Sequence, residues 1–259
     1  MDEVLPHLDK LSISIDHPSV HHDQLRGVPG LWDKLQEVIP QVRKRYPATG
    51  LVIIYTFLAS NTEAGPIEAM ARFAKEWGAT VVFNAMRIEA ASPGSTDNSR
   101  DLTVFNPSDE SLSEAYGHVA RLKKQGLPIL NSSSYIARMR NLPLVYRCHW
   151  PKFILPVEAN GDIVDCMHWG QTPIDNIRKR SFRAILASSR MQELTGAVGE
   201  ACHRCRSIHR FELSQMYEGR LGPLWSWGQR LLLDRWGLSS VLPVAKTGFP
   251  GPRFSRTLD

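Results

Sequence analysis

The cysteines are the residues of this sequence whose type and spacing point most directly to chemistry. All four lie in the second half of the chain: Cys148, Cys166, Cys202 and Cys205. The first two follow the pattern Cys-x12-Gly-x4-Cys, and the last two form a Cys-x2-Cys pair. Four thiolates are the ligand set of a [4Fe–4S] cluster or of a structural zinc ion. The spacing therefore predicts one metal centre that uses every cysteine of the chain.

Three alternatives to an iron–sulfur cluster can be weighed from the sequence. Two disulfides are disfavoured because no secretory signal is recognisable and a reducing cytosol keeps thiols free. A zinc site usually shows two Cys-x2-Cys pairs, and this sequence has one. Four separate buried thiols are the simplest structural explanation. The cluster is favoured because the cysteines are grouped and none is left over.

The segment between the first two cysteines predicts a β-hairpin. Two apolar runs flank the sequence Asn160-Gly161-Asp162, and Asn-Gly supplies the positive φ values of a tight turn. Such a turn would fold the chain back on itself. Cys148 and Cys166 would then lie side by side at the open end of the hairpin.

The cysteine pattern resembles the auxiliary-cluster module of radical S-adenosylmethionine enzymes, the SPASM/twitch domain. The segments at 148–151 and 170–177 are also similar to that domain. In the family the second segment opens a short helix, which the resemblance places at 174–189. No cysteine follows Cys205, so the resemblance is to the shorter twitch variety, which holds a single cluster.

Composition places the chain among ordinary globular proteins. Its 259 residues are 42% hydrophobic and 22% charged, with a net charge of +5. No Lys/Arg block is long enough to predict nucleic-acid binding. The longest apolar run, around 51–59, is far shorter than a transmembrane segment. We therefore expect a cytoplasmic protein with no nucleic-acid partner.

The first half alternates predicted strands and helices, which indicates a parallel sheet with crossover helices. Strands are predicted at 11–16, 50–58, 79–85 and 127–131. Helices are predicted at 30–46, 67–77, 109–124 and 132–140. Loops are predicted at 17–27 and 90–109. The helix at 109–124 is expected to begin after Ser108 as its N-cap.

This first half resembles the later part of the radical S-adenosylmethionine barrel. The segments at 12–16, 22–27 and 29–30 are similar to the fourth strand of that barrel and its following loop. The resemblance covers about residues 8–218 and implies an α/β fold, a partial (β/α) TIM-like barrel followed by a small module of β-hairpin plus helix. The domains it implies are a partial barrel at 1–143 and a SPASM/twitch-like module at 144–218. The remaining residues, 219–259, are predicted from their own pattern to form a C-terminal amphipathic helix, at 224–236, and a tail.

The resemblance also implies contacts to S-adenosylmethionine in the complete enzyme. The matching positions are Ser14, Asp16, Arg26 and Asn61. A guanidinium suits the carboxylate of the methionine moiety, and carboxylate or amide oxygens suit the ribose hydroxyls.

The sequence departs from the family in one respect. The family generates its radical on a second cluster held by a Cys-x3-Cys-x2-Cys loop, and this motif is absent from the sequence. We therefore expect the C-terminal portion of a radical S-adenosylmethionine enzyme, with an auxiliary [4Fe–4S] cluster for electron transfer or substrate positioning. It would need a missing N-terminal half or a partner chain, and a redox partner such as ferredoxin or flavodoxin. Alternatives are a non-catalytic iron–sulfur electron-transfer protein and a zinc-stapled binding module; the sequence does not specify a substrate.

Overall fold

The first half of the chain forms a parallel β-sheet, as predicted. The computed structural model describes residues 3–85, 105–164, 173–193, 195, 205–220 and 222. The strands β1 (Lys10–Ser14), β2 (Gly50–Phe57) and β3 (Thr80–Ala85) pair in the order β1-β2-β3. Both pairs are parallel, with Ser14 opposite Ile54 and Ile54 opposite Val82. The sheet is open, which agrees with a partial barrel.

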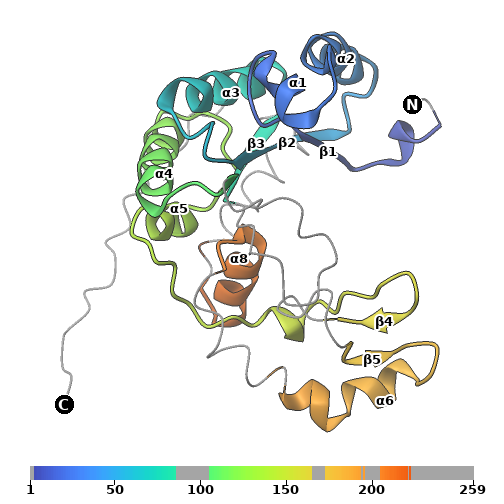
Figure 1. The fold of residues 1–259 in the computed structure, drawn as a ribbon. Coiled ribbons are helices and arrows are strands. Elements are labelled where there is room, and N and C mark those ends of the chain that lie inside the picture. Colours follow the sequence, from blue (N-terminus) through green and yellow to red (C-terminus); the bar gives the residue numbers. More distant parts are fainter. Residues whose placement is uncertain are drawn as a thin grey trace, which may run out of the picture.

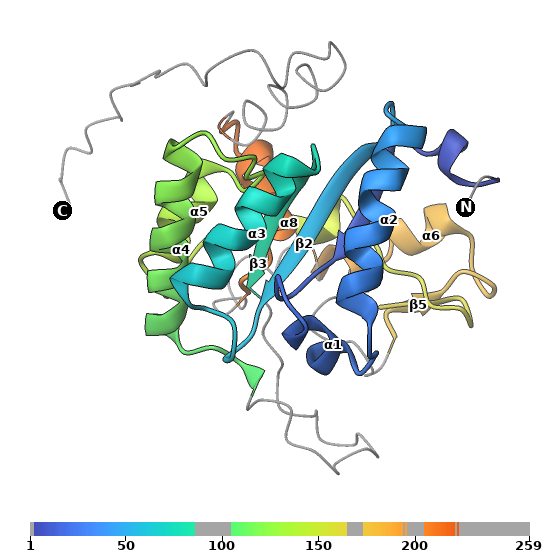
Figure 2. The same cartoon turned by 90° about the horizontal axis from the view of Figure 1, so that it is seen from above.

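Helices cover one face of this sheet (Figures 1 and 2). They are α2 (Leu31–Arg45), α3 (Ala64–Glu76) and α4 (Asp109–Lys124), followed by the short α5 (Ser133–Met139). The four predicted helices of the first half are thus confirmed. The side chain of Ser108 accepts a hydrogen bond from the backbone N–H of Ser111, so the predicted N-cap of α4 is also confirmed. None of the described helices is long and apolar enough to cross a membrane.

The predicted fourth strand is present as a short extension of the sheet. Residues Val81 and Ile129 form an isolated parallel bridge. The backbone N–H of Val81 donates to the carbonyl of Pro128 at 2.9 Å, and the N–H of Leu130 donates to the carbonyl of Val81 at 2.8 Å. Beyond this bridge, the side chain of Asn131 makes the hydrogen bonds to β3 in place of the backbone. Its Oδ1 accepts from the N–H of Phe83 at 2.8 Å, and its Nδ2 donates to the carbonyl of Phe83 at 2.7 Å.

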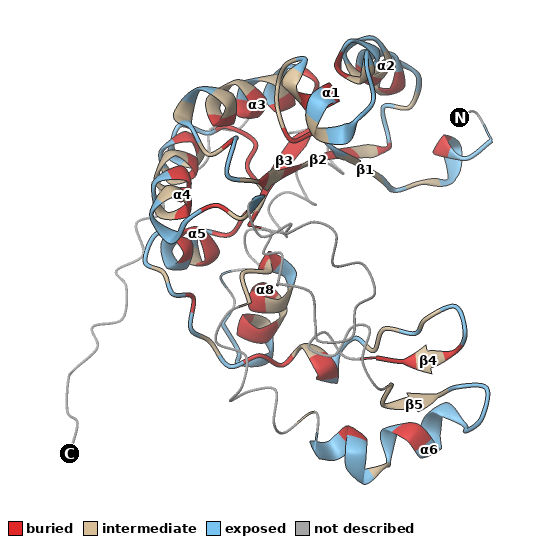
Figure 3. Cartoon of the chain, in the orientation of Figure 1, coloured by how far each residue is buried: buried red, intermediate tan, exposed pale blue. Residues whose placement is uncertain are grey.

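Aromatic rings connect the sheet to the helices. Phe57 stacks on Phe83 at 5.6 Å and meets the edge of Tyr116 of α4 at 5.3 Å. Tyr116 contacts Tyr135 of α5 at 5.6 Å. All four rings are fully buried, and Figure 3 shows buried residues along the faces of the helices that meet the sheet. This aromatic cluster (Phe57, Phe83, Tyr116 and Tyr135) gives the first half its core.

Removing the Tyr116 hydroxyl should cost little stability. The hydroxyl donates to the carbonyl of Phe83 at 3.0 Å, and Tyr116→Phe would leave that carbonyl bonded to the Asn131 amide. We expect the free energy of unfolding to fall by about 1 kcal/mol, which urea denaturation would measure. Tyr116→Ala, which also removes the ring, should cost about 3–5 kcal/mol. Equal losses in the two variants would contradict a core held mainly by ring packing.

A short helix occupies the segment predicted as a loop at 17–27. The helix α1 runs over His21–Arg26, and at its start the Ser19 hydroxyl accepts from the N–H of His21 at 3.2 Å. Gly27, with φ of +65°, ends the helix in the left-handed conformation. The loop prediction was wrong because local capping, which does not require apolar periodicity, stabilises this single turn and a half.

The hairpin predicted in the second half is confirmed, although its turn differs from the prediction. Val157 and Ile163 form an antiparallel bridge, and the N–H of Gly161 donates to the carbonyl of Glu158 at 2.8 Å. Gly161 has φ of +90°, and no described residue other than glycine has a positive φ. The expected left-handed conformation of Asn160 is therefore wrong, and a longer turn closed by Gly161 replaces the tight Asn-Gly turn.

The helix expected at 174–189 is shorter than predicted. Residues Asp175–Asn176 form the strand β5, which pairs antiparallel with β4 (Asp162–Ile163). The Asn176 side chain donates to Oδ1 of Asp162 at 2.7 Å, which holds β5 against the hairpin. Only after Ser181, whose hydroxyl caps the helix, does α6 (Phe182–Leu186) begin.

Two further described elements of the second half pack against each other. They are the 3-10 turn η3 (Trp150–Lys152) and the helix α8 (Ile208–Tyr217). Figure 1 shows α8 on the face of the sheet opposite α2 and α3. The predicted long loop, up to residue 104, and the amphipathic C-terminal helix at 224–236 lie outside the described residues.

Candidate metal centre

The structure brings two of the four predicted cysteine ligands together. Cys148 lies just before η3 and is 3% exposed, and Cys205 lies just before α8 and is half-buried. Neither forms a disulfide. Burial raises the pKa of the Cys148 thiol, and the nearby Cys205 thiol raises this pKa further. Cys166 and Cys202 lie outside the described residues, so the complete ligand set stays a prediction.

Polar groups around Cys148 favour its thiolate. Hydrogen bonds from the backbone of Trp150 and from the side chain of Ser214, with the positive charge of Arg210, oppose the rise in the pKa of Cys148. The thiolate is the form in which cysteine binds metal. A buried sulfur with polar groups and a cation nearby fits the role of a cluster ligand.

Cys205 is accompanied by the same cation. The Nη1 atom of Arg210 donates to the Cys205 sulfur at 3.5 Å. The guanidinium also lies over the ring of Trp150, with Cζ 5.5 Å from the ring centroid. Because Trp150 follows Cys148 by two residues, Arg210 connects the two ends of the cysteine-containing segment.

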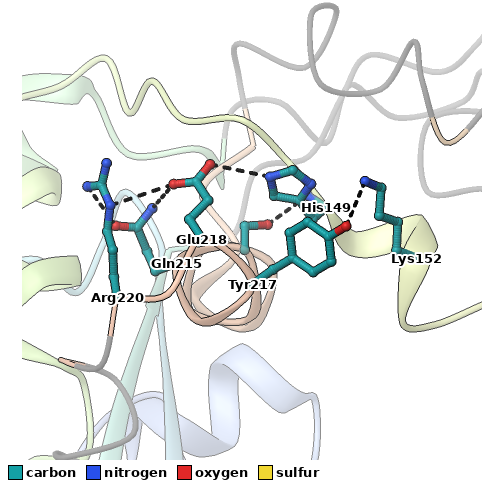
Figure 4. Close-up of polar contacts among 7 residues, drawn as sticks. His149, Lys152, Gln215, Tyr217, Glu218 and Arg220 are labelled. Carbon is teal, nitrogen blue, oxygen red and sulfur yellow. Dashed lines mark hydrogen bonds and ion pairs between the residues drawn. The ribbon is translucent and has the colours of Figure 1, made fainter.

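The residues after Cys148 are fastened to the C-terminal part of α8 (Figure 4). The N–H of His149 donates to the Ser214 hydroxyl at 2.8 Å, and its imidazole packs on the ring of Tyr217 at 4.4 Å. Its Nε2 lies 3.3 Å from Oε1 of Glu218. Lys152 donates to the hydroxyl of Tyr217 at 3.1 Å. These contacts fix the position of the backbone that carries Cys148.

A second set of side chains continues this network. Gln215 donates to Oε2 of Glu218 at 3.5 Å, and Arg220 donates to Oε1 of Gln215 at 3.1 Å. The Nε atom of Arg220 lies 3.6 Å from Oε2 of Glu218. Glu218 therefore receives support from both sides, and its carboxylate is held toward His149.

The helix α8 also attaches the cysteines to the sheet domain. Glu212 is 1% exposed, and its Oε1 accepts from the N–H of Ser132, at the start of α5. The hydroxyl of Tyr135 donates to the carbonyl of Arg206 at 2.6 Å, and the guanidinium of Arg206 pairs with Asp109. The position of Cys205 is thus set by contacts with α4 and α5.

No role for α8 was predicted from the sequence. The available signal was the spacing of Arg210, Ser214 and Glu218, which are four residues apart and so share one face of a helix. That spacing directly after the Cys-x2-Cys pair would have indicated a polar face next to the cysteines.

Three of the predicted cofactor-binding residues meet at the carboxyl end of β1. Ser14 is its last residue and is exposed, and Asp16, two residues later, is buried. Nη2 of Arg26 lies 2.6 Å from Oδ2 of Asp16. The other carboxylate oxygen of Asp16 accepts from the N–H of Thr56 at 3.3 Å. Asp16 thus joins the ends of β1 and β2 and orients Arg26, which is partly open to solvent.

Asn61, the fourth predicted residue, is fully buried and bonded to the backbone. Its Nδ2 donates to the carbonyls of Asp16 at 2.7 Å and Thr56 at 2.9 Å. Its Oδ1 accepts from the N–H of Leu58 at 2.7 Å. Both amide protons are used, so the structure gives Asn61 a role in holding the strand ends. A direct cofactor contact by Asn61 stays a prediction.

A buried histidine lies beside Asp16. Nδ1 of His22 accepts from the backbone N–H of Asp16 at 3.2 Å, and burial lowers the pKa of His22. The neutral imidazole therefore carries its proton on Nε2. That atom is buried and has no hydrogen-bond partner among the described residues. An unpaired buried donor at this edge of the sheet is a group that a polar ligand could satisfy.

Known proteins resemble this chain in its cysteine-containing segment and in its fold. Residues 148–206 match the SPASM iron–sulfur cluster-binding domain. The structure is similar to native anSMEcpe with bound AdoMet and Cp18Cys peptide, with a TM-score of 0.53, 12% identity, and coverage of 90% of this chain and 72% of that chain. The hexahistidine-tagged anSMEcpe with bound AdoMet gives the same TM-score and identity, with 90% and 68% coverage. No curated protein matches the sequence significantly.

These findings confirm the resemblance inferred from the cysteines. The residues that match the SPASM domain, a domain that binds an iron–sulfur cluster, include all four cysteines. The structural likeness shows the fold alone: this chain shares the α/β arrangement of those structures over 90% of its length.

Proposed function

We propose that this chain is the C-terminal portion of a radical S-adenosylmethionine enzyme, with an auxiliary [4Fe–4S] cluster held by Cys148, Cys166, Cys202 and Cys205. The observation that carries the proposal is the SPASM match, which spans all four cysteines. The polar surroundings of Cys148 and Cys205 support it. The SPASM match favours an iron–sulfur centre over a zinc-stapled binding module.

The auxiliary cluster would act in electron transfer. Four cysteine ligands complete the coordination of a [4Fe–4S] cluster and leave no iron open to substrate. The protein would position the cluster through α8, exclude water from Cys148, and exchange electrons with a redox protein such as ferredoxin or flavodoxin.

The carboxyl end of the sheet would bind S-adenosylmethionine. Ligands of open α/β sheets bind beyond the carboxyl ends of parallel strands, which is where Ser14, Asp16 and Arg26 meet. The unpaired Nε2 of His22 lies in the same region, and the similar structures contain bound AdoMet. The radical-generating cluster would be supplied by another segment or a partner chain that carries Cys-x3-Cys-x2-Cys.

Replacement of Arg26 tests the proposed cofactor site. Arg26→Met should weaken binding of S-adenosylmethionine to the full chain by about tenfold or more, because a charged hydrogen bond contributes about 1.5–3 kcal/mol. Isothermal titration calorimetry would measure the dissociation constants. The matched control is Arg72→Met, on α3, where Arg72 pairs with Glu68. Equal affinities of wild type and Arg26→Met would remove Arg26 from the site.

Anaerobic reconstitution tests the cluster itself. We expect about four irons and four sulfides per chain, with broad visible absorption that bleaches on reduction. One bound zinc and no colour would contradict the proposed function and favour the zinc-stapled module.

A further inference from the structure

The helix α8 presents hydrogen-bond donors to both described cysteines. It begins at Ile208, beyond the matched domain, which ends at residue 206. Arg210 and Ser214 are four residues apart and share one face of the helix. Arg210 donates to the sulfur of Cys205, and the Ser214 hydroxyl accepts from the backbone N–H of His149, the residue directly after Cys148. One helical face therefore contacts both ends of the cysteine-containing segment.

We propose that Arg210 and Ser214 raise the reduction potential of the auxiliary cluster by donating hydrogen bonds to the sulfurs of Cys205 and Cys148. This inference rests on the proposed function. Reduction adds one electron to a cluster that already carries negative charge from its thiolates. Donors and positive charge next to the sulfurs stabilise the reduced form more than the oxidised form, and this raises the potential.

Arg210 is suited to this role because its charge is permanent and its position is fixed. A guanidinium stays protonated in proteins. Nη1 lies 3.5 Å from the Cys205 sulfur, and the group rests over the Trp150 ring with Cζ 5.5 Å from the centroid. Trp150 lies two residues after Cys148 in the chain. The cation is therefore held near both sulfurs.

Ser214 is suited to this role because its hydroxyl is already oriented. Its oxygen accepts from the backbone N–H of His149 at 2.8 Å, which leaves its proton free to point toward the sulfur of Cys148. Ser214 is fully buried, so water does not compete for this proton. His149 is in turn held by the ring of Tyr217 and the carboxylate of Glu218 (Figure 4). The network around Glu218 thus positions the serine donor.

The test compares cluster potentials in the full chain after anaerobic reconstitution. Arg210→Gln, Arg210→Lys and Ser214→Ala would be titrated with dithionite in the presence of redox mediators and followed by electron paramagnetic resonance. We expect Arg210→Gln to lower the equilibrium constant for reduction about tenfold, which is about 59 mV for a one-electron couple. Ser214→Ala should shift it in the same direction by less. Arg210→Lys keeps the positive charge, so its cluster should have a reduction potential between those of Arg210→Gln and wild type.

The controls separate this inference from the proposed function. Arg72→Gln removes an exposed guanidinium from α3 and should leave the potential unchanged. Wild type without a cluster would overturn both the proposed function and this inference. Full iron content with an unchanged potential in Arg210→Gln and Ser214→Ala would overturn only the inference. Loss of iron from all three variants would assign these side chains to cluster assembly, and this would also overturn it.

Discussion

Cys148→Ser is expected to reduce bound iron from about four atoms per chain to well below one. Cys148 is 3% exposed, so water cannot readily replace the missing sulfur ligand. A serine hydroxyl at this position would still receive the hydrogen bonds around Cys148, but it lacks the soft thiolate that iron–sulfur clusters require. Iron and sulfide counts after anaerobic reconstitution, together with the visible spectrum, would measure the loss.

The same experiment extends to the cysteines outside the described residues. Cys166→Ser and Cys202→Ser should lose iron to a similar degree, because a cluster with three protein ligands is less stable than one with four. The matched control is Ser188→Ala, a partly buried side chain whose hydroxyl bonds within its own turn. Unchanged iron in any one cysteine variant would remove that residue from the ligand set.

The strands β2 and β3 could be predicted because they are largely buried on both faces. Residues 50–57 and 80–85 are nearly continuous apolar runs, and each corresponds to an observed strand. α4 could be placed to the residue because Ser108 caps it. α1 could not, since its six residues carry little apolar signal and depend on Ser19 and Gly27.

The cysteine spacing was sufficient to identify the cluster domain, but not its surroundings. Which face of α8 meets the sulfurs depends on tertiary contacts such as that of Glu212 with Ser132, and these leave no local signal. The prediction of a helix over 174–189 was wrong in its extent for a related reason. Asn176 bonds to Asp162 across the hairpin, and this pairing outweighs the local preference for helix.

Asn61 illustrates how a buried polar residue can be read in two ways. Its position after β2 suggested a cofactor contact, whereas its amide bonds to the backbone at three carbonyl or N–H groups. Asn131 does the same at the end of the fourth strand, with two bonds to Phe83. In both places a side-chain amide replaces the ladder bonds that the diverging strands no longer make.

Asn61→Ala is therefore expected to lower the free energy of unfolding by about 3 kcal/mol, and Asn131→Ala by about 2 kcal/mol. Each lost bond contributes about 1 kcal/mol, and the buried backbone groups left behind gain no water. Urea denaturation would measure both losses. The matched control is Asn141→Ala, an exposed residue whose amide donates once to the carbonyl of Ala137. It should cost less than about 0.5 kcal/mol.

The Asn61 variant also tests whether stability and cofactor binding are linked at this edge. Asn61 bonds to the carbonyl of Asp16, and the carboxylate of Asp16 pairs with Arg26. Loss of the amide should loosen this pair and weaken S-adenosylmethionine binding. If Asn61→Ala lowers the free energy of unfolding by no more than Asn141→Ala does, the Asn61 amide does not hold the strand ends. Reduced affinity with unchanged stability would instead favour direct contact between Asn61 and the cofactor.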